Sequence, residues 1–158
     1  MPVAEWSDDY LTGDELVDEH HRTLFGFVNE LYDAIQEGRG RAALEPTLTK
    51  LWEYTAMHFA VEEQLMAQEG YPDIEAHRVQ HREGRHLATG LMDRYRLAAT
   101  ILPSALSQEL AGWLVRHICD HDRRMIQWLR ARNVSASSVN PISATTAAAQ
   151  DLEVTKVG

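Results

Sequence analysis

The chain has 158 residues, a formal net charge of −9 at pH 7 and an apolar content of 44%. This length is enough for one well-packed core, but it is too short for two domains of ordinary size. The negative charge argues against nucleic acid or an anionic membrane as the main partner. Cys119 is the only cysteine, which excludes an intramolecular disulfide, a cysteine-rich zinc site and an iron–sulfur cluster.

The N-terminal segment, residues 1–9, has no basic region followed by an apolar run, so it is not expected to be an export signal. No stretch of the chain approaches the roughly 20 apolar residues that cross a bilayer. We expect a soluble, cytoplasmic protein without a membrane partner. Trp6 and Tyr10 are expected to anchor the N-terminal arm on the end of the fold.

Four successive segments carry apolar residues at intervals of three and four, which is the period of an amphipathic helix. Glycines or prolines separate these segments. Pro46 is expected in the first turn of the second helix, because deeper inside the helix it would remove a hydrogen bond and force a kink. The expected helices cover about residues 16–37, 45–69, 73–101 and 104–131.

Connections of only a few residues place consecutive helices antiparallel. The sequence therefore predicts an all-α fold, an antiparallel up-down-up-down four-helix bundle, over residues 1–132. From residue 133 onward the composition turns to Ser, Ala, Thr and Val, and a periodic apolar face is almost absent. We expect residues 133–158 to form a mostly disordered C-terminal tail.

Side chains that can bind metals interrupt the apolar stripes of the helices. His58 and Glu62 are four residues apart in the second stripe, and the third stripe repeats this spacing at His77 and His81. A step of four places two side chains on one face of a helix. An unpaired ion in a core costs roughly several kcal/mol, so several such groups together indicate a metal centre.

These groups can meet at one level of the bundle. His21 lies near the start of the first helix and His117 midway along the fourth. Because the helices alternate in direction, the start of one is level with the end of the next. A histidine-rich set with carboxylates suits iron, with zinc, manganese and copper as competitors. Five histidines and two carboxylates exceed what one ion needs, whereas two ions that share bridging carboxylates would use them all.

The same residues resemble the motifs of the bacterial hemerythrins, over the chain from about Trp6 to Leu129. One motif alone would be a weak signal, but all the ligand positions of that family are present, in order and at the right spacings. The matching segments are residues 17–25 (Val-Asp-Glu-His-His-Arg-Thr-Leu-Phe), residues 58–66 (His-Phe-Ala-Val-Glu-Glu-Gln-Leu-Met), residues 70–72 (Gly-Tyr-Pro), His77 with His81, and residues 113–118 (Trp-Leu-Val-Arg-His-Ile) followed by Asp122.

The resemblance implies a non-haem di-iron centre, with two iron ions (Fe2+/Fe3+) joined by carboxylates and by a bridging oxo or hydroxo group. One iron would have three histidines and the other two. The iron with two histidines would have a vacant position, where members of the family bind dioxygen. The implied ligands are His77, His81 and His117 for one iron, His21 and His58 for the other, and Glu62 and Asp122 as the bridges.

Two of these assignments have alternatives. Only His21 continues the apolar stripe of its helix, and His20 is expected at the surface. In the fourth helix the period favours His121, four residues after His117, whereas the resemblance favours Asp122, five residues after. We follow the resemblance, because a bridging carboxylate balances the charge of two cations and a π-bulge would accommodate a step of five. His121 is then expected beside the ligands or at the surface.

An apolar pocket around the vacant position would limit the water that can expel reduced oxygen, which favours carrying dioxygen over consuming it. Glu63 is expected in solvent or beside the ligands, and the arginines of the third helix on a solvated face. The candidate residues of the oxygen pocket are Leu24, Phe25, Phe59, Trp113, Leu114 and Ile118.

Three functions follow from such a centre. The leading hypothesis is a binding protein, not an enzyme, that takes up dioxygen reversibly for storage, delivery or buffering. The second is an oxygen or redox sensor that signals to a protein partner, whose identity the sequence does not indicate. The third is a di-iron oxidase, peroxidase or nitric oxide reductase. Ferritin-like oxidases usually use carboxylate-rich sets with a Glu-x-x-His step of three, whereas this chain has histidine-rich pairs at steps of four.

Overall fold

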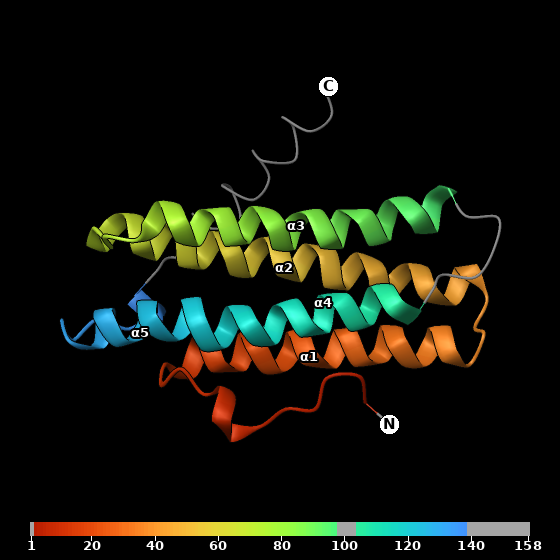
Figure 1. Ribbon diagram of the computed structural model, residues 1–158, viewed down its shortest axis with the longest axis horizontal. Helices are drawn as coiled ribbons and strands as arrows, with labels where there is room; N and C mark the ends of the chain where they lie inside the picture. The colour runs from red at the N-terminus through yellow and green to blue at the C-terminus, as the bar shows by residue number, and fades with distance from the viewer. Residues whose placement is uncertain (1, 98–103, 139–158) are drawn as a thin grey trace.

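The computed structural model describes residues 2–97 and 104–138. Within these residues the chain is helical, with long helices that lie side by side along one common axis (Figure 1). The long elements are α1 (Glu15–Gln36), α2 (Arg41–Glu69), α3 (Ile74–Leu97), α4 (Ser104–His117), the π-helical turn η2 (Ile118–Asp122) and α5 (Arg123–Arg130). Two short 3-10 turns are η1 (Asp8–Tyr10) and η3 (Ala136–Ser138).

The fold is the four-helix bundle that the sequence predicts. α4, η2 and α5 follow one another without a break and together form the fourth rod. α1 packs against α2 and α4, and α3 packs against the same two helices. Each rod therefore has two neighbours and turns one apolar face into a shared interior.

The helix ends follow local chemistry that the sequence carries. Asp14 caps α1, because its side chain accepts hydrogen bonds from the backbone N–H groups of Leu16 and Val17. Gly70 ends α2 in the left-handed conformation, with φ 69° and ψ 41°, and its N–H donates to the carbonyl of Met66. The residues 70–72 therefore separate α2 from α3 as expected.

The start of α2 differs from the expectation. The helix begins at Arg41, so Pro46 lies in its second turn and not in its first. Tyr95 of α3 stabilises the additional turn, since its hydroxyl donates to the carbonyl of Arg41 at 2.8 Å. The Arg41 guanidinium also lies over the Tyr95 ring, 4.8 Å from its centroid. These contacts join residues far apart in the sequence, which explains why local propensity did not reveal the earlier start.

The apolar interior consists of two clusters with a polar layer between them. In α1, Val17 belongs to one cluster and Leu24 to the other, and His21 lies between them in sequence. In the fourth rod, Ile118 and Met125 flank Asp122 in the same way. The layer is thus enclosed by apolar packing on both sides along the bundle axis.

Trp6 and Tyr10 anchor the N-terminal arm as expected, but the arm lies along the side of α1 and not on the end of the bundle (Figure 1). The Trp6 ring packs edge-on against Phe25 of α1 at 5.4 Å between centroids, and Tyr10 lies 5.6 Å from the same ring. Asn29 of α1 holds the arm by exchanging two hydrogen bonds with the backbone of Ala4, at 2.9 and 2.7 Å.

The chain after α5 turns back onto the bundle. The Ala136 N–H donates to a side-chain oxygen of Asp14 at 2.8 Å, and the Ser135 hydroxyl donates to the same oxygen at 3.0 Å. Ala136 is fully buried in the apolar cluster that includes Val17. The expectation of a disordered tail from residue 133 is therefore wrong for residues 134–138, and residues 139–158 lie outside the described part of the chain.

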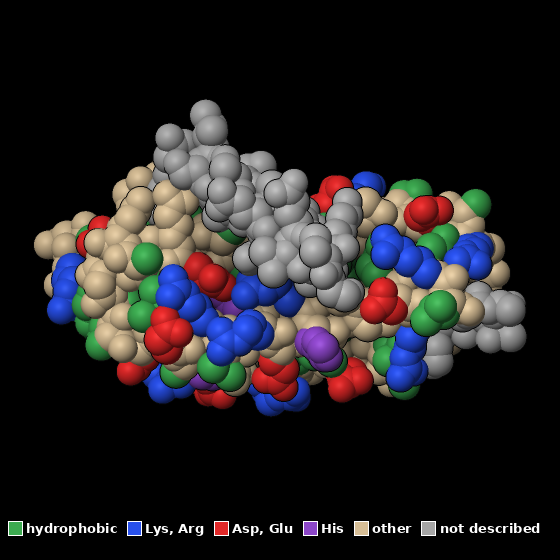
Figure 2. Space-filling model, turned by 90° about the horizontal axis from the view of Figure 1, so that it is seen from above, with side chains coloured by type: hydrophobic (Ala, Val, Ile, Leu, Met, Phe, Trp, Pro, Cys, Tyr) green, Lys and Arg blue, Asp and Glu red, His purple; other side chains and the backbone are tan. Residues whose placement is uncertain are grey.

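None of the helices in the described ranges is long and apolar enough to cross a membrane. On the face shown in Figure 2, basic and acidic side chains are interspersed rather than gathered by sign. Three arginines of α3 are exposed, in agreement with the expected solvated face, whereas Arg78 and Arg85 are half-buried. The exposed arginines are Arg82, Arg94 and Arg96.

Gly84 sets how closely α3 approaches α4, and replacing it tests the packing. A Cβ atom at this position would lie 2.7 Å from Cζ2 and 2.8 Å from Cζ3 of Trp113. We expect Gly84→Ala to lower the free energy of unfolding by about 1–3 kcal/mol, as overpacking does.

Gly90→Ala is the matched control on the same helix, because nothing lies within 4 Å of its added Cβ. It should raise stability by about 0.5–1 kcal/mol. Urea unfolding measures both, and equal effects of the two variants would contradict the packing argument.

Candidate metal centre

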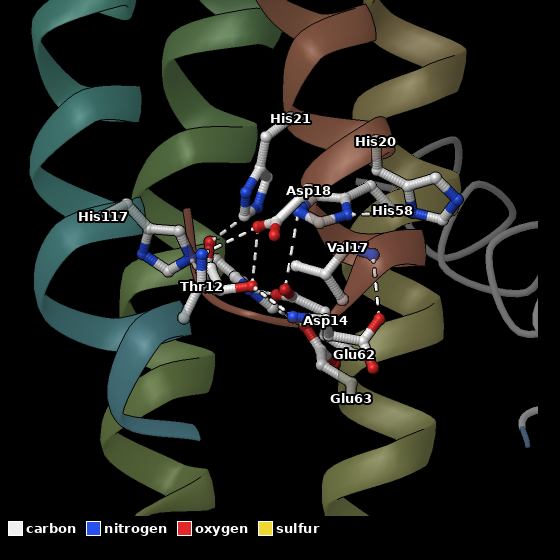
Figure 3. A network of polar contacts seen from close by, with 12 residues as sticks. Thr12, Asp14, Val17, Asp18, His20, His21, His58, Glu62, Glu63 and His117 are labelled. Atoms are coloured by element: carbon white, nitrogen blue, oxygen red, sulfur yellow. Dashed lines mark hydrogen bonds and ion pairs between the residues drawn. The ribbon is translucent and has the colours of Figure 1, made fainter. Parts of the chain in front are cut away.

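Side chains from all four rods converge in the polar layer. Each of them is at most 2% exposed, although all are polar or ionisable. Figure 3 shows His21 and His117 directed from different helices toward the same part of the interior. The converging residues are His21 of α1, His58 and Glu62 of α2, His77 and His81 of α3, His117 of α4, and Asp122 of η2.

The seven side chains form two overlapping groups. In each group, one ligand atom from every residue lies within 4.8 Å of the ligand atoms of the others. Glu62 and Asp122 belong to both groups. The first group adds three histidines, His77, His81 and His117, and the second adds two, His21 and His58. The structure therefore brings together every residue that the sequence predicted as a ligand.

Glu62 turns one oxygen to each group. Its Oε1 lies 3.6 Å from Nε2 of His58. Its Oε2 lies 3.5 Å from Nε2 of His77 and 3.0 Å from Nε2 of His81. Since His58 and Glu62 are four residues apart on α2, one turn of helix aligns both with the interior.

Asp122 is divided between the groups in the same way. Its Oδ2 lies 3.0 Å from Nε2 of His21, and its Oδ1 lies 3.1 Å from Nε2 of His77 and 2.9 Å from Nε2 of His117. The π-helical turn of residues 118–122 brings residues five apart onto one face, which confirms the expected π-bulge. His121 belongs to neither group. It is half-buried, and its ring stacks on His117 at 5.5 Å.

The protonation of these groups depends on burial and on their neighbours. Burial lowers the pKa of His58, and nearby His21 lowers it further. Burial likewise lowers the pKa of His81, and the charge of His77 adds to this effect. For His77 burial acts in the same direction, but the close contacts with the carboxylates of Asp122 and Glu62 outweigh it and raise the pKa to about 10. Without a metal, His77 is therefore protonated and is a cation between the two carboxylates.

The pKa values of the two carboxylates, Glu62 and Asp122, are shifted in opposite directions. Burial raises the pKa of Glu62, and the adjacent charge of Asp122 raises it further. Burial also acts to raise the pKa of Asp122, but the charge of His117 and the close contacts with three histidines hold it well below its usual range. Asp122 is thus ionised at neutral pH, and a buried anion requires a positive charge beside it.

The donor set fits metal ions. Many ligand atoms in the layer are buried and make no hydrogen bond of good geometry with the described residues, although ring nitrogens lie 2.9–3.1 Å from the oxygens of Asp122. They include both ring nitrogens of His21 and both oxygens of Asp122. Folded proteins rarely leave buried polar atoms without partners. Imidazole nitrogens with shared carboxylates suit first-row transition metals such as iron and zinc. A pair of cations would satisfy these atoms and balance the carboxylate charge.

Glu63 supports the group with three histidines from outside. Its Oε1 accepts a hydrogen bond from Nδ1 of His81 at 2.8 Å and another from Arg85 at 3.2 Å. A histidine that binds metal commonly donates its second ring N–H to a carboxylate, which sets the direction of the ring. Of the two places that the sequence left open for Glu63, solvent or beside the ligands, the structure gives the second.

The expected surface position of His20 is wrong. Its side chain is only 8% exposed and lies between α1 and α2, beside His58 and Tyr54. His20 is three residues after Val17 and four before Leu24. This spacing places His20 at the edge of the apolar stripe, and it is the sequence signal that would have predicted its burial.

The six candidate pocket residues are all buried, at 0–5% exposed. Four of them, with four further residues, line a small apolar cavity beside the layer. Phe25 instead packs against Trp6 and Tyr10, and Ile118 is not among the lining residues. The cavity is lined by Leu24, Val28, Leu51, Thr55, Phe59, Leu110, Trp113 and Leu114.

Comparison with known proteins agrees with this site. The family model described as the hemerythrin HHE cation binding domain matches residues 12–129. The chain belongs to the hemerythrin family, as its motifs predicted. All seven converging residues lie inside the matched range.

Relatives and solved structures cover most of the chain. A bacteriohemerythrin of Pseudomonas aeruginosa (strain UCBPP-PA14) is 33% identical over 133 residues, which cover 82% of this chain and 84% of the relative. A bacteriohemerythrin of Methylococcus capsulatus (strain Bath) is 28% identical over 124 residues, covering 78% and 94%. A crystal structure of wild-type hemerythrin superposes with a TM-score of 0.70 and 28% identity, over 76% of this chain and 92% of that one.

The unpartnered atoms predict that metal ions stabilise the fold. We expect a chelator to lower the melting temperature and ferrous or zinc ions to restore it, because ligand at a hundredfold excess over its Kd stabilises a protein by about 2.7 kcal/mol. Magnesium is the control, since it prefers carboxylate and water oxygens to imidazole. Differential scanning calorimetry measures the change. A melting temperature that is the same with chelator, zinc and iron would contradict the interpretation of the layer as a metal centre.

Proposed function

We propose that the polar layer holds two iron ions and that the protein binds dioxygen reversibly. The observation that carries the proposal is that the two oxygens of each carboxylate, Glu62 and Asp122, face different histidine groups. Each of them turns one oxygen to the pair His21 and His58 and the other oxygen to the group with three histidines. This pattern suits two ions with shared bridges better than one ion with surplus ligands.

The proposed roles follow from the two groups. Glu62 and Asp122 would hold both ions, and the histidines would divide three to two between them. When bound, a pair of ferrous ions supplies the two electrons that retain dioxygen and that return when it leaves. We assign dioxygen to the side of His21 and His58, which has one histidine fewer. The three-histidine side comprises His77, His81 and His117.

The aromatic residues around the layer hold the imidazoles in place. The Phe59 ring stacks on His81 at 4.0 Å between centroids, with 11° between the planes. The Trp113 ring stacks on His117 at 4.7 Å, with 12° between the planes. Each stack restricts rotation of the histidine side chain, so the nitrogen that faces the layer keeps its direction.

The surroundings of the layer favour carrying oxygen rather than consuming it. The cavity next to the layer is lined almost entirely by apolar side chains, and its one hydroxyl, of Thr55, is engaged with the carbonyl of Leu51 at 2.7 Å. This lining contributes no acid that could deliver protons to reduced oxygen. Water gains no hydrogen bonds in such a space, whereas dioxygen is apolar and loses none there.

Oxygen binding can be tested directly. We expect about two irons per chain, and an anaerobically reduced sample whose visible spectrum changes on adding dioxygen and returns on removing it. His58→Ala should lose iron from one position and lose the reversible change. His86→Ala is the matched control, since His86 is exposed on α3 and should behave as wild type. Normal iron content and oxygen binding in His58→Ala would overturn the proposal.

Turnover assays on the same iron-loaded protein distinguish an oxygen carrier from an enzyme. Steady consumption of peroxide, nitric oxide or a reductant with many turnovers per chain would identify an enzyme and contradict the carrier role. A sensor would keep the reversible spectrum but would bind a protein only in one oxygenation state. Pull-down with the reduced and the oxygenated full-length chain tests this second outcome.

Metal uptake should release protons. The pKa of His77 is raised to about 10 in the absence of metal, so this side chain is protonated at pH 7, whereas a metal ligand must be neutral. Binding therefore displaces a proton, and metal affinity rises as the pH rises from 6 toward 9. Calorimetric titration with zinc in buffers of different ionisation enthalpy gives the number of protons released. Uptake without proton release at pH 7 would contradict the raised pKa of His77.

A further inference from the structure

His20 contacts one of the proposed iron ligands from outside the layer. Its Nδ1 lies 3.3 Å from Nδ1 of His58, and the two rings are nearly perpendicular, at 88°, with centroids 5.4 Å apart. Figure 3 shows the His20 ring beside His58, on the side away from the interior of the bundle. This contact joins α1 to α2 next to the group that has two histidines.

The contact determines which nitrogen of His58 can face the layer. The Nε2 of His58 is the nitrogen that faces Glu62. A nitrogen that binds metal carries no proton, so a neutral His58 has its proton on Nδ1. That N–H needs an acceptor, and among the described residues the structure places Nδ1 of His20 in that position. His20 must then have a bare Nδ1 and its proton on Nε2.

The position of His20 is itself restricted. Its ring packs edge-on against Tyr54 of α2, at 5.7 Å between centroids and 84° between planes. The side chain is only 8% exposed, and the next residue, His21, points into the layer. Two consecutive residues of α1 thus lie at the same proposed metal position. His21 faces it directly, and His20 contacts it through His58.

Only some of the histidines in the layer have a hydrogen-bond partner for the ring nitrogen that faces away from the proposed metal. The second ring nitrogens of His21, His77 and His117 have no partner among the described residues. His81 donates to the carboxylate of Glu63, whereas His58 faces an imidazole. Each group therefore contains one histidine with an outer partner, and the partner is anionic in one group and a histidine in the other.

We propose that His20 is a positioning residue, which accepts a hydrogen bond from Nδ1–H of His58 and thereby fixes the tautomer that presents Nε2 to the metal. The inference rests on the proposed function, because it requires His58 to be a ligand. Loss of such outer partners commonly lowers metal affinity by about tenfold to a hundredfold. The loss should affect the metal position of His21 and His58 and spare the other.

The experiment titrates the metal-free full-length chain with ferrous ion under anaerobic conditions. His20→Leu fills the position with an apolar side chain and removes the hydrogen-bond acceptor. His20→Asn restores an acceptor, since its Oδ1 lies near the place of the imidazole Nδ1. His86→Leu is the control at an exposed histidine of α3. Circular dichroism checks that each variant is folded.

We expect His20→Leu to weaken one of two binding steps by about tenfold or more, and we expect His20→Asn and His86→Leu to resemble the wild type. Two unchanged steps in His20→Leu would overturn the role of His20 and leave the proposed function standing. A folded His20→Asn as weak as His20→Leu would also overturn it, since the loss would then come from packing. A wild-type chain that binds fewer than two metal ions would overturn the proposed function first.

A second measurement needs no variant and therefore stands if His20→Leu fails to fold. In the zinc-loaded, 15N-histidine-labelled wild type, NMR identifies the protonated nitrogen of each ring. We expect the proton of His58 on Nδ1, slow to exchange with solvent, and the proton of His20 on Nε2. A proton on Nδ1 of His20, or on Nε2 of His58, would overturn the inference.

Discussion

The structure depends on two buried carboxylates that five imidazoles share. Glu62 and Asp122 are fully buried, and each faces histidines from different rods. Buried anions are costly unless cations and hydrogen bonds surround them. In the metal-free chain a proton on His77 partly meets this need, but many donor atoms keep no partner. The polar layer is therefore a site built around positive charge, and the remainder of the bundle holds it at one level.

The apolar clusters perform that task from both sides. They pack the four rods above and below the layer, so that ligands from different helices remain level. Trp113 and His117 are one turn apart on α4, where their rings stack, and the missing Cβ of Gly84 leaves room for the Trp113 ring between α3 and α4. The π-helical turn then moves Asp122 into the layer, where an ordinary α-helix would have presented His121. Packing and a local distortion together place the second shared carboxylate.

The two ends of the layer are not equivalent. The side with three histidines has Glu63 and Arg85 outside it, a charged arrangement that strengthens His81 as a donor. The side with two histidines has His20 and Tyr54 outside it. A site with one richer and one poorer position suits a pair of ions in which a single ion meets an external ligand. The apolar cavity beside the layer favours a ligand as small and apolar as dioxygen.

The residue pattern alone predicted the bundle, its antiparallel order and six of the seven converging residues, all except Asp122. These follow from the period of the apolar stripes, from histidines at steps of four, and from motifs whose spacing a helix translates directly into geometry. Choosing Asp122 over His121 required the family resemblance, because periodicity alone favoured the latter. Three features became visible only in the folded chain: the contacts of His20, the early start of α2 beside Tyr95, and the return of Ala136 onto Asp14. Each of these depends on which side chains of another segment lie opposite, and no local pattern in the chain encodes that.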